Sequence, residues 1–526
     1  MQYITYLFMI KRVRERIMKK LIYITLLLVL VSAGLTAQVN GELTLVEGKK
    51  ILHVWGNHYQ RGYAQGYLLS QPIMQIFDEY IFQIVAMGNP TVYNAVVAFF
   101  QDSFEVEYKY HSEAQGIIDG MLEAGSILYI PNLGRTLTSD DLLTFNCIPD
   151  IYPYFSNIGY ELNVGMYCAS LSSWGTATQA DTLLAGSAVI TRFLDWDMDD
   201  ALVGNPIMIV SHPSEPDEQK TINFGYPGLM GMLSGINESG TSAFLNMGNV
   251  HSTGNVTGLH PMLLSIRNGL ESADYNDDGN ADMMDVYDAI AYENYLSGTI
   301  VHTLSENPQP EAGIIEANNV SGVVMRTQAF ADDMPGMNLA ATNHFRMLSS
   351  PVCCTRYASI ADSLYTNANV SAKRQYAILS GAAGQDNNMM AIQFTPSTGR
   401  ILWANASFSD PAFDNSATAL NSNELFAYST SAVDEVVTPV PHTLRVYPNP
   451  AKSFVAIALL GPEKRDAKVE VFNLKGQKIN SLQGDGKTWR WDGRDAKGEL
   501  AGNGIYLFRL QDAQGRIQTA RALLLK

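Results

Sequence analysis

The body of the chain repeats its apolar residues with two different periods. Residues 59–82 place apolar side chains at the spacing of one helix face, which predicts a long helix. Residues 189–196, 207–211 and 241–245 form short and mostly apolar runs, which predict strands. A mixture of such helices and strands indicates an α+β domain.

The carboxy-terminal part of the chain has a different pattern. Residues 469–472 alternate between apolar and polar side chains and end at the turn-forming sequence Asn-Leu-Lys-Gly, and a second short run follows at 505–510. Short strands at this spacing predict a small all-β sandwich domain over residues 444–526. The small residues and two prolines of residues 429–443 predict a linker between this sandwich and the body.

The amino-terminal segment has the pattern of an export signal. Two lysines precede an apolar run of 11 residues at 21–31, and small residues follow as far as Ala37. A helix needs about 20 residues to cross a bilayer, so a membrane anchor is the weaker interpretation. We therefore expect a signal peptide over residues 1–37, with Met18 as an alternative start, and a mature chain without a transmembrane segment.

Composition and charge narrow the function classes. The 526 residues are 46% hydrophobic and 17% charged, which excludes a mainly disordered or coiled-coil chain. Within the net charge of −17, residues 445–526 carry an excess of seven positive charges and residues 1–37 an excess of five, so the body between them carries −29. An acidic body makes nucleic acid a poor partner. Four cysteines are too few for a disulfide scaffold.

The chemistry of the body centres on Cys168 and on two charged residues that follow it. Arg192 and Asp195 lie three positions apart among large apolar residues, where a guanidinium and a carboxylate are costly unless they pair or serve a site. Two interpretations are open at this point. Cys168 is either a small buried residue beside a structural ion pair or a nucleophile with polar neighbours.

These residues carry a family resemblance. The sequence Cys-Ala-Ser-Leu-Ser-Ser-Trp-Gly at 168–175 and Arg-Phe-Leu-Asp-Trp at 192–196 resemble the amino-terminal-nucleophile (Ntn) hydrolases, in particular the C45 peptidase family with its isopenicillin acyltransferases. Choloylglycine hydrolases, acid ceramidase and the phospholipase-B-like proteins are wider relatives. Further segments resemble the family in chain order, at 58–66, 235–240, 342–345 and 355–357.

The resemblance implies a four-layer αββα sandwich over residues 38–428. In this family the nucleophile begins a strand in the middle of the sandwich. Cys168 can do so only if the chain cuts itself between Tyr167 and Cys168. The expected products are residues 38–167 and 168–526, which stay packed together.

The resemblance also implies a role for each polar residue of the site. A free α-amine titrates near pH 8, so the new amine of Cys168 would act as the base for its own thiol, which attacks an acyl carbonyl. Asn237 and a backbone N–H would stabilise the oxyanion. The other expected members are Asp195, which orients the amine, Arg192, which lowers the pKa of the thiol or holds the carboxylate, and the polar residues Asn343 and Arg356.

One departure from the family pattern concerns the hairpin after the nucleophile. Arg192 follows Cys168 by 24 residues, which is a longer separation than in compact relatives. A one-residue slip in the strand pairing would turn the Arg192 side chain to the wrong face. The register of these two strands therefore decides whether Arg192 belongs to the site.

An acidic segment further along the body has the spacing of a calcium loop. Oxygen-bearing side chains occupy loop positions 1, 3, 5, 9 and 12, and Gly279 occupies position 6, where glycine permits the sharp turn. We expect a structural calcium ion, and the alternative is an acidic turn that caps a helix starting near Met283. The residues concerned are Asp274, Asn276, Asp278, Asn280, Asp282 and Asp285.

The carboxy-terminal sandwich carries a second resemblance. The sequences Val-Tyr-Pro-Asn-Pro-Ala at 446–451, Trp-Asp-Gly-Arg-Asp at 491–495 and Gly-Ile-Tyr at 504–506 resemble the sorting domain of Bacteroidetes type IX secretion cargo. The resemblance implies the type IX secretion machinery as a partner, passage across the outer membrane, and surface attachment or release. The alternative is a plain accessory sandwich.

Together these features predict a secreted hydrolase that cleaves a linear amide bond of a small N-acyl substrate, or transfers the acyl group, without a catalytic cofactor. An alternative within the same fold is a phospholipase-B-like enzyme that acts on lipid-like esters or amides. An alternative of another class is a catalytically silent surface-binding protein. For the three remaining cysteines, Cys147, Cys353 and Cys354, either one disulfide or three inert thiols is expected.

Overall fold

The computed structural model divides into two compact units, one ending at Thr430 and the other beginning at Ser431. This division falls inside the stretch 429–443 that the sequence predicts as a linker. The predicted signal peptide and residues 430–442 of the linker lie outside the described residues. The structure describes residues 39–157, 162, 167–248, 256–318, 320–329, 334–349, 351–383, 387–429, 443–447, 451–460, 468–473, 477–484, 487–511 and 517–525.

A nine-stranded sheet runs through the larger unit. Its neighbouring strands are antiparallel, except that β2 and β7 are parallel. In spatial order the strands are β1 (Gly41–Val46), β2 (Lys49–Gly56), β7 (Ile207–Pro213), β8 (Thr221–Gly225), β9 (Ser234–Asn237), β10 (Ser242–Met247), β11 (Thr299–Ser305), β12 (Glu311–Asn318) and β13 (Gly322–Thr327). The strands predicted at 207–211 and 241–245 are thus β7 and β10.

A six-stranded antiparallel sheet faces the first one. Its strands, in spatial order, are β14 (Asn338–Ala341), β5 (Tyr167–Ser173), β6 (Val189–Asp195), β15 (Asn388–Thr395), β16 (Arg400–Asn405) and β17 (Thr418–Asn421). β5 and β6 pair without a shift, from Tyr167 opposite Asp195 to Ser173 opposite Val189. The register slip considered for the long hairpin therefore does not occur, and Arg192 lies opposite Ser170.

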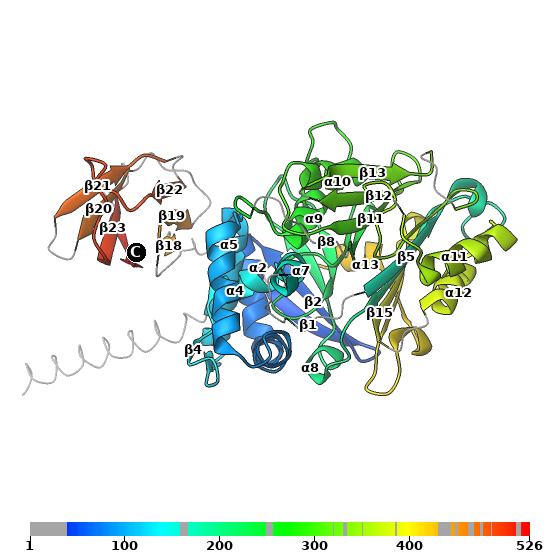
Figure 1. Cartoon of the computed structure of the whole chain (residues 1–526), viewed down its shortest axis with the longest axis horizontal. Coiled ribbons are helices and arrows are strands. Elements are labelled where there is room, and N and C mark those ends of the chain that lie inside the picture. Colours follow the sequence, from blue (N-terminus) through cyan, green and yellow to red (C-terminus); the bar gives the residue numbers. More distant parts are fainter. Residues whose placement is uncertain are drawn as a thin grey trace, which may run out of the picture. The chain divides into compact units, whose positions relative to one another are not determined.

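Helices cover the outer face of each sheet (Figure 1). α2, α9 and α10 contact the nine-stranded sheet, α5 packs on α2, and α11 and α12 contact the six-stranded sheet. The two sheets meet where β10 contacts β5 and β12 contacts β14. The predicted α+β, four-layer αββα sandwich is confirmed.

The helices of the larger unit are α2 (His58–Leu68), α3 (Ser70–Gln75), the π-helix η1 (Ile76–Val85), α4 (Pro90–Ser103), α5 (Tyr108–Glu123), α6 (Ser139–Phe145), α7 (Ile148–Asn157), α8 (Asp200–Val203), α9 (Met262–Glu271), α10 (Met283–Ala291), α11 (Thr355–Thr366), α12 (Ala372–Ala383) and α13 (Ser422–Phe426). Single 3₁₀ turns are η2 (Gly175–Ala177), η3 (Pro396–Thr398) and η4 (Ala412–Asp414). A two-stranded hairpin pairs β3 (Tyr129–Ile130) with β4 (Arg135–Thr136).

The first helices show a close backbone contact. The helix predicted over residues 59–82 is divided into α2, α3 and η1. Gly62 and Gly66 of α2 face α5, and Gly116 and Gly120 of α5 face α2. A Cβ atom at any of the four would overlap a backbone carbonyl oxygen of the other helix. Only glycine therefore permits this separation between the two helices.

The alternation along β5 places Cys168 between the two sheets. Successive side chains of a strand point to opposite faces. Leu171 packs in the cluster that includes side chains of α11 and α12, whereas Ser170 and Ser172 each hydrogen-bond a ring nitrogen of His302 on β11 at 2.8 Å. Cys168 has the same parity as the two serines, so its side chain enters the interior of the sandwich.

The smaller unit is a β-sandwich, as predicted. One sheet has the order β18 (Thr443–Tyr447), β19 (Val455–Leu460), β22 (Thr488–Trp491), and the other has the order β21 (Lys478–Leu482), β20 (Lys468–Asn473), β23 (Gly504–Gln511), β24 (Ile517–Leu524). Both sheets contribute to one apolar core that includes Ile457, Val471, Trp491 and Phe508.

Candidate functional site

Cys168 is the second residue of β5 and lies next to the guanidinium that the sequence predicts for it. The cysteine is completely buried, and its Sγ lies 3.4 Å from Nη2 of Arg192. The same Nη2 donates a hydrogen bond to the carbonyl oxygen of Leu245 on β10 at 2.8 Å. The unbroken β5–β6 register thus brings Arg192 of one strand to the thiol of the other.

The charges at this thiol are only partly compensated. Burial raises the pKa of Cys168, and the positive charge of Arg192 opposes that rise. Burial also lowers the pKa of Arg192, whose Nε and Nη1 have no hydrogen-bond partner in the described part of the chain. A buried donor without a partner costs about 1–3 kcal/mol. The N–H groups of these two nitrogens are therefore available to an oxygen atom that enters the site.

Two side chains hold the peptide groups of Cys168. Its backbone N–H donates to Oδ1 of Asn343 at 3.0 Å, and its carbonyl oxygen accepts from Nη1 of Arg356 at 2.9 Å. Nη2 of Arg356 also donates to Oδ1 of Asn343 at 2.6 Å, and Nδ2 of Asn343 donates to the carbonyl oxygen of Met247 at 2.8 Å. Tyr167 is 45% exposed, so the predicted cleavage point joins an accessible residue to a buried one.

Asp195 completes the cluster at the end of β6. Its Oδ2 lies 3.5 Å from Nη1 of Arg356, and its Oδ1 accepts a hydrogen bond from Nδ2 of Asn388 at 2.9 Å. Burial raises the pKa of the Asp195 carboxyl, and the bond from Asn388 opposes that rise. The structure therefore brings five of the six predicted site residues together: Cys168, Arg192, Asp195, Asn343 and Arg356.

Asn237 is placed elsewhere, which corrects the oxyanion assignment. It ends β9, where its Oδ1 accepts from the Thr241 N–H at 2.8 Å and its Nδ2 donates to the Leu270 carbonyl at 3.2 Å. β10 pairs with β9 at its beginning and reaches the site only at its far end, near Met247. Asn237 stabilises its own turn, because its amide is used by neighbours there.

Asn388 was not predicted from the sequence. It begins β15, where the pairing with β6 shifts between Asn388 and Met390. This irregularity places Asn388 beside Asp195, the residue that it opposes. No motif marks such a residue, because a bulge depends on the register of two strands that are far apart in the sequence.

The acidic loop lies between α9 and α10 and folds around its own backbone. Oδ2 of Asp274 accepts from the Gly279 N–H at 2.8 Å, and Gly279 has a φ of 88°. Asp282 caps α10, which starts at Met283, and Asp285 accepts from the Tyr275 N–H at 2.6 Å. These contacts fit the predicted helix cap, and the oxygen-only donor set also suits calcium. Both interpretations of the loop stay predictions.

A second buried charge cluster, the helix-layer network, joins α2, α5, α9 and the β7–β8 connection. His58 contacts Glu113 at 2.7 Å and Glu218 at 2.8 Å through its two ring nitrogens. Arg61 contacts Glu218 at 2.9 Å, and Arg267 contacts Glu113 at 2.8 Å. The network consists of His58, Arg61, Glu113, Glu218, Arg267 and Glu271.

By distance alone His58, Glu218 and Glu271 could hold a metal ion. However, Glu271 lies 3.0 Å from Nη2 of Arg61 and 3.0 Å from Nη2 of Arg267, so its charge is already neutralised. Two guanidinium groups repel a cation at this position. The cluster therefore suits a structural ion network better than a metal site.

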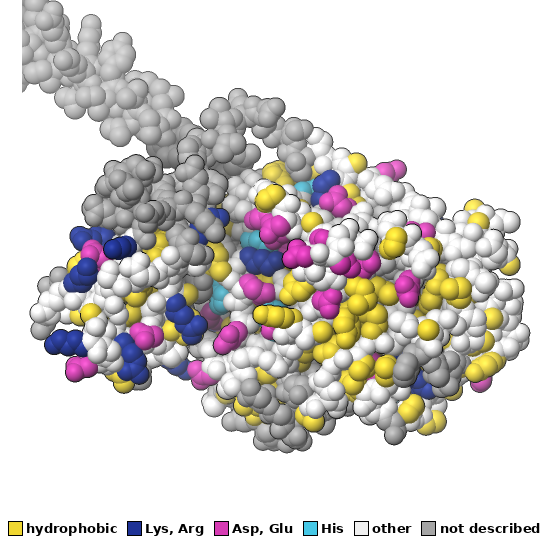
Figure 2. Space-filling view, turned by 90° about the horizontal axis from the view of Figure 1, so that it is seen from above, with side chains coloured by type: hydrophobic (Ala, Val, Ile, Leu, Met, Phe, Trp, Pro, Cys, Tyr) yellow, Lys and Arg dark blue, Asp and Glu magenta, His cyan; other side chains and the backbone are white. Residues whose placement is uncertain are grey.

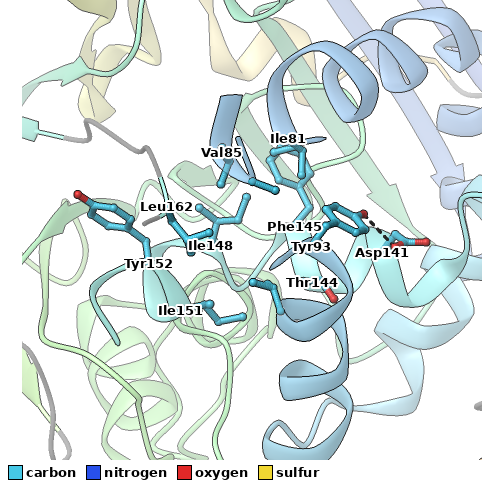
Figure 3. Close-up of a pocket in the computed structure, with 12 residues that line it drawn as sticks. Ile81, Val85, Tyr93, Asp141, Thr144, Phe145, Ile148, Ile151, Tyr152 and Leu162 are labelled. Carbon is cyan, nitrogen blue, oxygen red and sulfur yellow. Dashed lines mark hydrogen bonds between the residues drawn. The ribbon is translucent and has the colours of Figure 1, made fainter. Parts of the chain in front are cut away.

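The cysteines and one pocket add little to the site. All four cysteines are free thiols, with Cys147 buried and Cys353 exposed. An apolar pocket lies between η1, α4, α6 and α7, and Figure 3 shows side chains such as Ile81, Phe145 and Leu162 around it. Its free volume is about 30 Å³, room for roughly one water molecule, and none of the five clustered residues lines it.

The carboxy-terminal unit matches a known family model. Residues 445–523 match the secretion system C-terminal sorting domain, which confirms the sorting-domain prediction. This domain indicates that the protein is secreted or displayed on the outer surface and is handled by a secretion machinery. Lys and Arg side chains gather on this unit in Figure 2, in line with its positive balance. Among the described residues, no helix has the length and apolar character needed to span a membrane.

The chain also has more distant similarities to known proteins. Protein dcd1B of Dictyostelium discoideum is 22% identical over 206 residues, which are 36% of this chain and 36% of that protein. The N-acylethanolamine-hydrolyzing acid amidase ortholog of Caenorhabditis elegans has 16% identity and a TM-score of 0.33, covering 48% of this chain and 100% of its own. A variant of conjugated bile acid hydrolase from Clostridium perfringens has 10% identity and a TM-score of 0.30, covering 51% and 100%.

Proposed function

We propose that this secreted protein is a self-processing hydrolase of the amino-terminal-nucleophile type, which cleaves a linear amide bond of an N-acyl compound. The proposal is carried by one observation. Cys168, at the start of a strand inside an αββα sandwich, is surrounded by Arg192, Asp195, Asn343 and Arg356. A buried structural cysteine needs no such partners, whereas a nucleophile that generates its own amine does.

Self-processing begins with the thiol of Cys168. The sulfur attacks the carbonyl carbon of Tyr167, the Tyr167–Cys168 C–N bond breaks, and the nitrogen receives the thiol proton. Water then cleaves the thioester, which leaves a carboxylate on Tyr167 and a free amine and thiol on Cys168. Asn343 and Arg356 support this step because they fix the peptide groups on both sides of the cysteine α-carbon.

Turnover then uses the new amine as the base. An α-amine titrates near pH 8, so it can accept the thiol proton while the sulfur attacks the substrate carbonyl. The amide C–N bond breaks, the leaving amine takes up the proton, and the acyl group stays on the sulfur as a thioester. Water releases the acid, or a second amine takes the acyl group. Asp195, held beside Arg356, would orient the amine.

The oxyanion needs donors near the sulfur. Asn237 lies too far along β9 to donate to the oxyanion. Arg192 contacts the thiol through Nη2, and its Nε and Nη1 have no hydrogen-bond partner among the described residues. We assign the oxyanion interaction to this arginine together with the backbone N–H of Met247, whose hydrogen bond lowers the pKa of the Cys168 thiol. A single such donor is typically worth about 100- to 1000-fold in rate.

Two measurements test the proposal. Intact mass and amino-terminal sequencing of the secreted protein should show a chain that begins at Cys168 next to one that ends at Tyr167. A panel of N-acyl amino acids, bile-salt conjugates, penicillins and phospholipids should then show amide cleavage. An unbroken Tyr167–Cys168 bond with no turnover would support the silent binding protein instead, and cleavage of phospholipid esters alone would support the lipid esterase.

A further inference from the structure

We propose that Asn388 is a positioning residue of the reactive centre, which holds the Asp195 carboxyl group turned toward Cys168 through a hydrogen bond to Oδ1. The assignment of catalysis to this centre rests on the proposed function. The contact between Asn388 and Asp195, and its electrostatic effect, can be tested without any turnover.

Asn388 reaches Asp195 because of the irregular pairing at the start of β15. Asn388 lies opposite Asp195, yet the next paired residue is Met390, opposite Leu194. Met389 is therefore the extra residue of a β-bulge, a feature that re-aims neighbouring side chains. The Asn388 amide also donates to the Leu194 carbonyl of β6 at 3.2 Å, and this second bond fixes the orientation of the Asn388 side chain.

The contact separates the two oxygens of Asp195. Oδ1 accepts from Asn388 at 2.9 Å, and Oδ2 faces Arg356 at 3.5 Å. Arg356 also binds the carbonyl oxygen of Cys168, so Oδ2 lies on the side of the nucleophile. With Oδ1 occupied by Asn388, Oδ2, which faces Arg356 at 3.5 Å, is the oxygen that can turn to the amine of the processed cysteine.

Both residues are completely buried, so water cannot replace the bond. The groups that face Asp195 are Asn388 from β15, Arg356 from α11, Arg192 from β6 and the Cys168 thiol from β5. Among those that favour the ionised form, the hydrogen bond from Asn388 has the largest effect. Without it, burial dominates and the carboxyl keeps its proton to higher pH.

A protonated Asp195 cannot attract the ammonium or orient the amine of Cys168. We therefore expect loss of the Asn388 amide to reduce self-cleavage and turnover mainly on the acid side of the pH profile. A role in packing alone would reduce them at every pH. This difference separates a positioning residue from a merely structural one.

The experiment uses the full chain carrying Cys168→Ala, so that every sample is unprocessed. Unfolding of the larger unit in urea is followed by the labelling of buried Cys147 with 4,4′-dithiodipyridine, at pH values from 4 to 8. Asn388→Leu is compared with its parent, and Gln393→Leu is the matched control. Gln393 is a buried amide on the same strand, but it bonds Thr191 and Ala372 instead of Asp195.

The sign of the effect is fixed by the carboxyl. A folded-state pKa above the unfolded one means that stability falls as pH rises through the folded-state pKa. Asn388→Leu raises that pKa further. The factor by which this variant increases the unfolding equilibrium constant should therefore grow by tenfold or more between pH 4 and pH 8. Gln393→Leu should increase the unfolding equilibrium constant by a factor that does not change with pH. Asp195→Asn should remove the pH dependence of the Asn388 effect.

Two results would overturn the proposal: a cost of Asn388→Leu that is constant from pH 4 to 8, or a pH-dependent cost that persists with Asp195→Asn. If Asn388→Leu does not fold, Asn388→Ser removes the same donor with a smaller side chain and is judged by the same criteria. Intact mass of the wild-type protein reports the proposed cleavage separately, so the two ideas can fail independently.

Discussion

The reactive centre, which consists of Cys168, Arg192, Asp195, Asn343 and Arg356, and the helix-layer network are both buried clusters of charged residues. Burial and pairing affect the ionisation of the two clusters in opposite ways. In the network, Arg267 and His58 overcome the effect of burial and hold the pKa of Glu113 at about 2. In the reactive centre, burial prevails and raises the pKa values of Cys168 and Asp195. One cluster stabilises its ionised forms, and in the other burial favours the neutral forms of the thiol and the carboxyl.

The difference lies in how many partners each charge has. Glu271 faces both Arg61 and Arg267, and Glu218 and Glu113 each face one of these guanidinium groups as well. Arg192, by contrast, has one nitrogen, Nη2, that contacts both Cys168 and Leu245, and its other two nitrogens have no hydrogen-bond partner among the described residues. Incomplete pairing costs stability and is retained where a reacting group needs the unused donors. Pairing therefore distinguishes the proposed catalytic cluster from the helix-layer network.

The largest effect is expected at the sulfur itself. Cys168→Ala removes the nucleophile of both proposed reactions, so self-cleavage should stop and turnover should fall by at least about 1000-fold. Gel analysis and substrate turnover of the purified variant measure both. Full activity in this variant would end the proposal, and Cys147→Ala serves as the control because that thiol lies outside the site.

Substitutions in the helix-layer network should change the unfolding free energy of the protein and not its reaction rates. Arg267→Met leaves Glu113 and Glu271 partly uncompensated in the interior, which should cost about 3–5 kcal/mol of unfolding free energy. Urea unfolding measures this cost. Arg135→Met breaks a pair between a partly exposed arginine and the buried Asp141, and it should cost less, because Asp141 keeps its hydrogen bonds from Tyr93 and Thr138. A harmless Arg267→Met would contradict the view that the network is structural.

The reactive centre should show the reverse behaviour. Arg192→Met removes a guanidinium with two unpartnered nitrogens, so unfolding free energy should change by less than about 1 kcal/mol. Self-cleavage and turnover should nevertheless fall about 100- to 1000-fold, since the proposed oxyanion donors are lost. If this variant lost stability as Arg267→Met does while it kept its rates, the contrast between the two clusters would disappear.

The smallest effect concerns the acidic loop. If calcium binds there, removal of the ion with a chelator should lower the melting temperature of the full chain by a few degrees, because a ligand stabilises only the state that binds it. Asp274→Asn should abolish that shift, since it weakens position 1 of the loop. An unchanged melting temperature would leave the loop as a helix cap for α10.

Much of the fold could be predicted from the sequence, because apolar runs marked β6, β7 and β10. The five clustered residues were predicted from motifs that resemble a known family, and the regular pairing of β5 with β6 brings Arg192 to Cys168. Asn237 and Asn388 could not be assigned correctly for a different reason. Whether an asparagine reaches the thiol depends on which end of a strand meets the other sheet and on a bulge, and neither feature is periodic in sequence.

The glycine contact between α2 and α5 has a mechanical consequence. Both helices belong to the segment before Tyr167, and their backbones touch without intervening side chains. Such a pair has no layer of side chains between its helices that could be compressed, so we expect α2 and α5 to move as one rigid body. Any movement that follows the proposed cleavage at Tyr167–Cys168 must therefore take place around this helix pair, because the two helices leave no room between them.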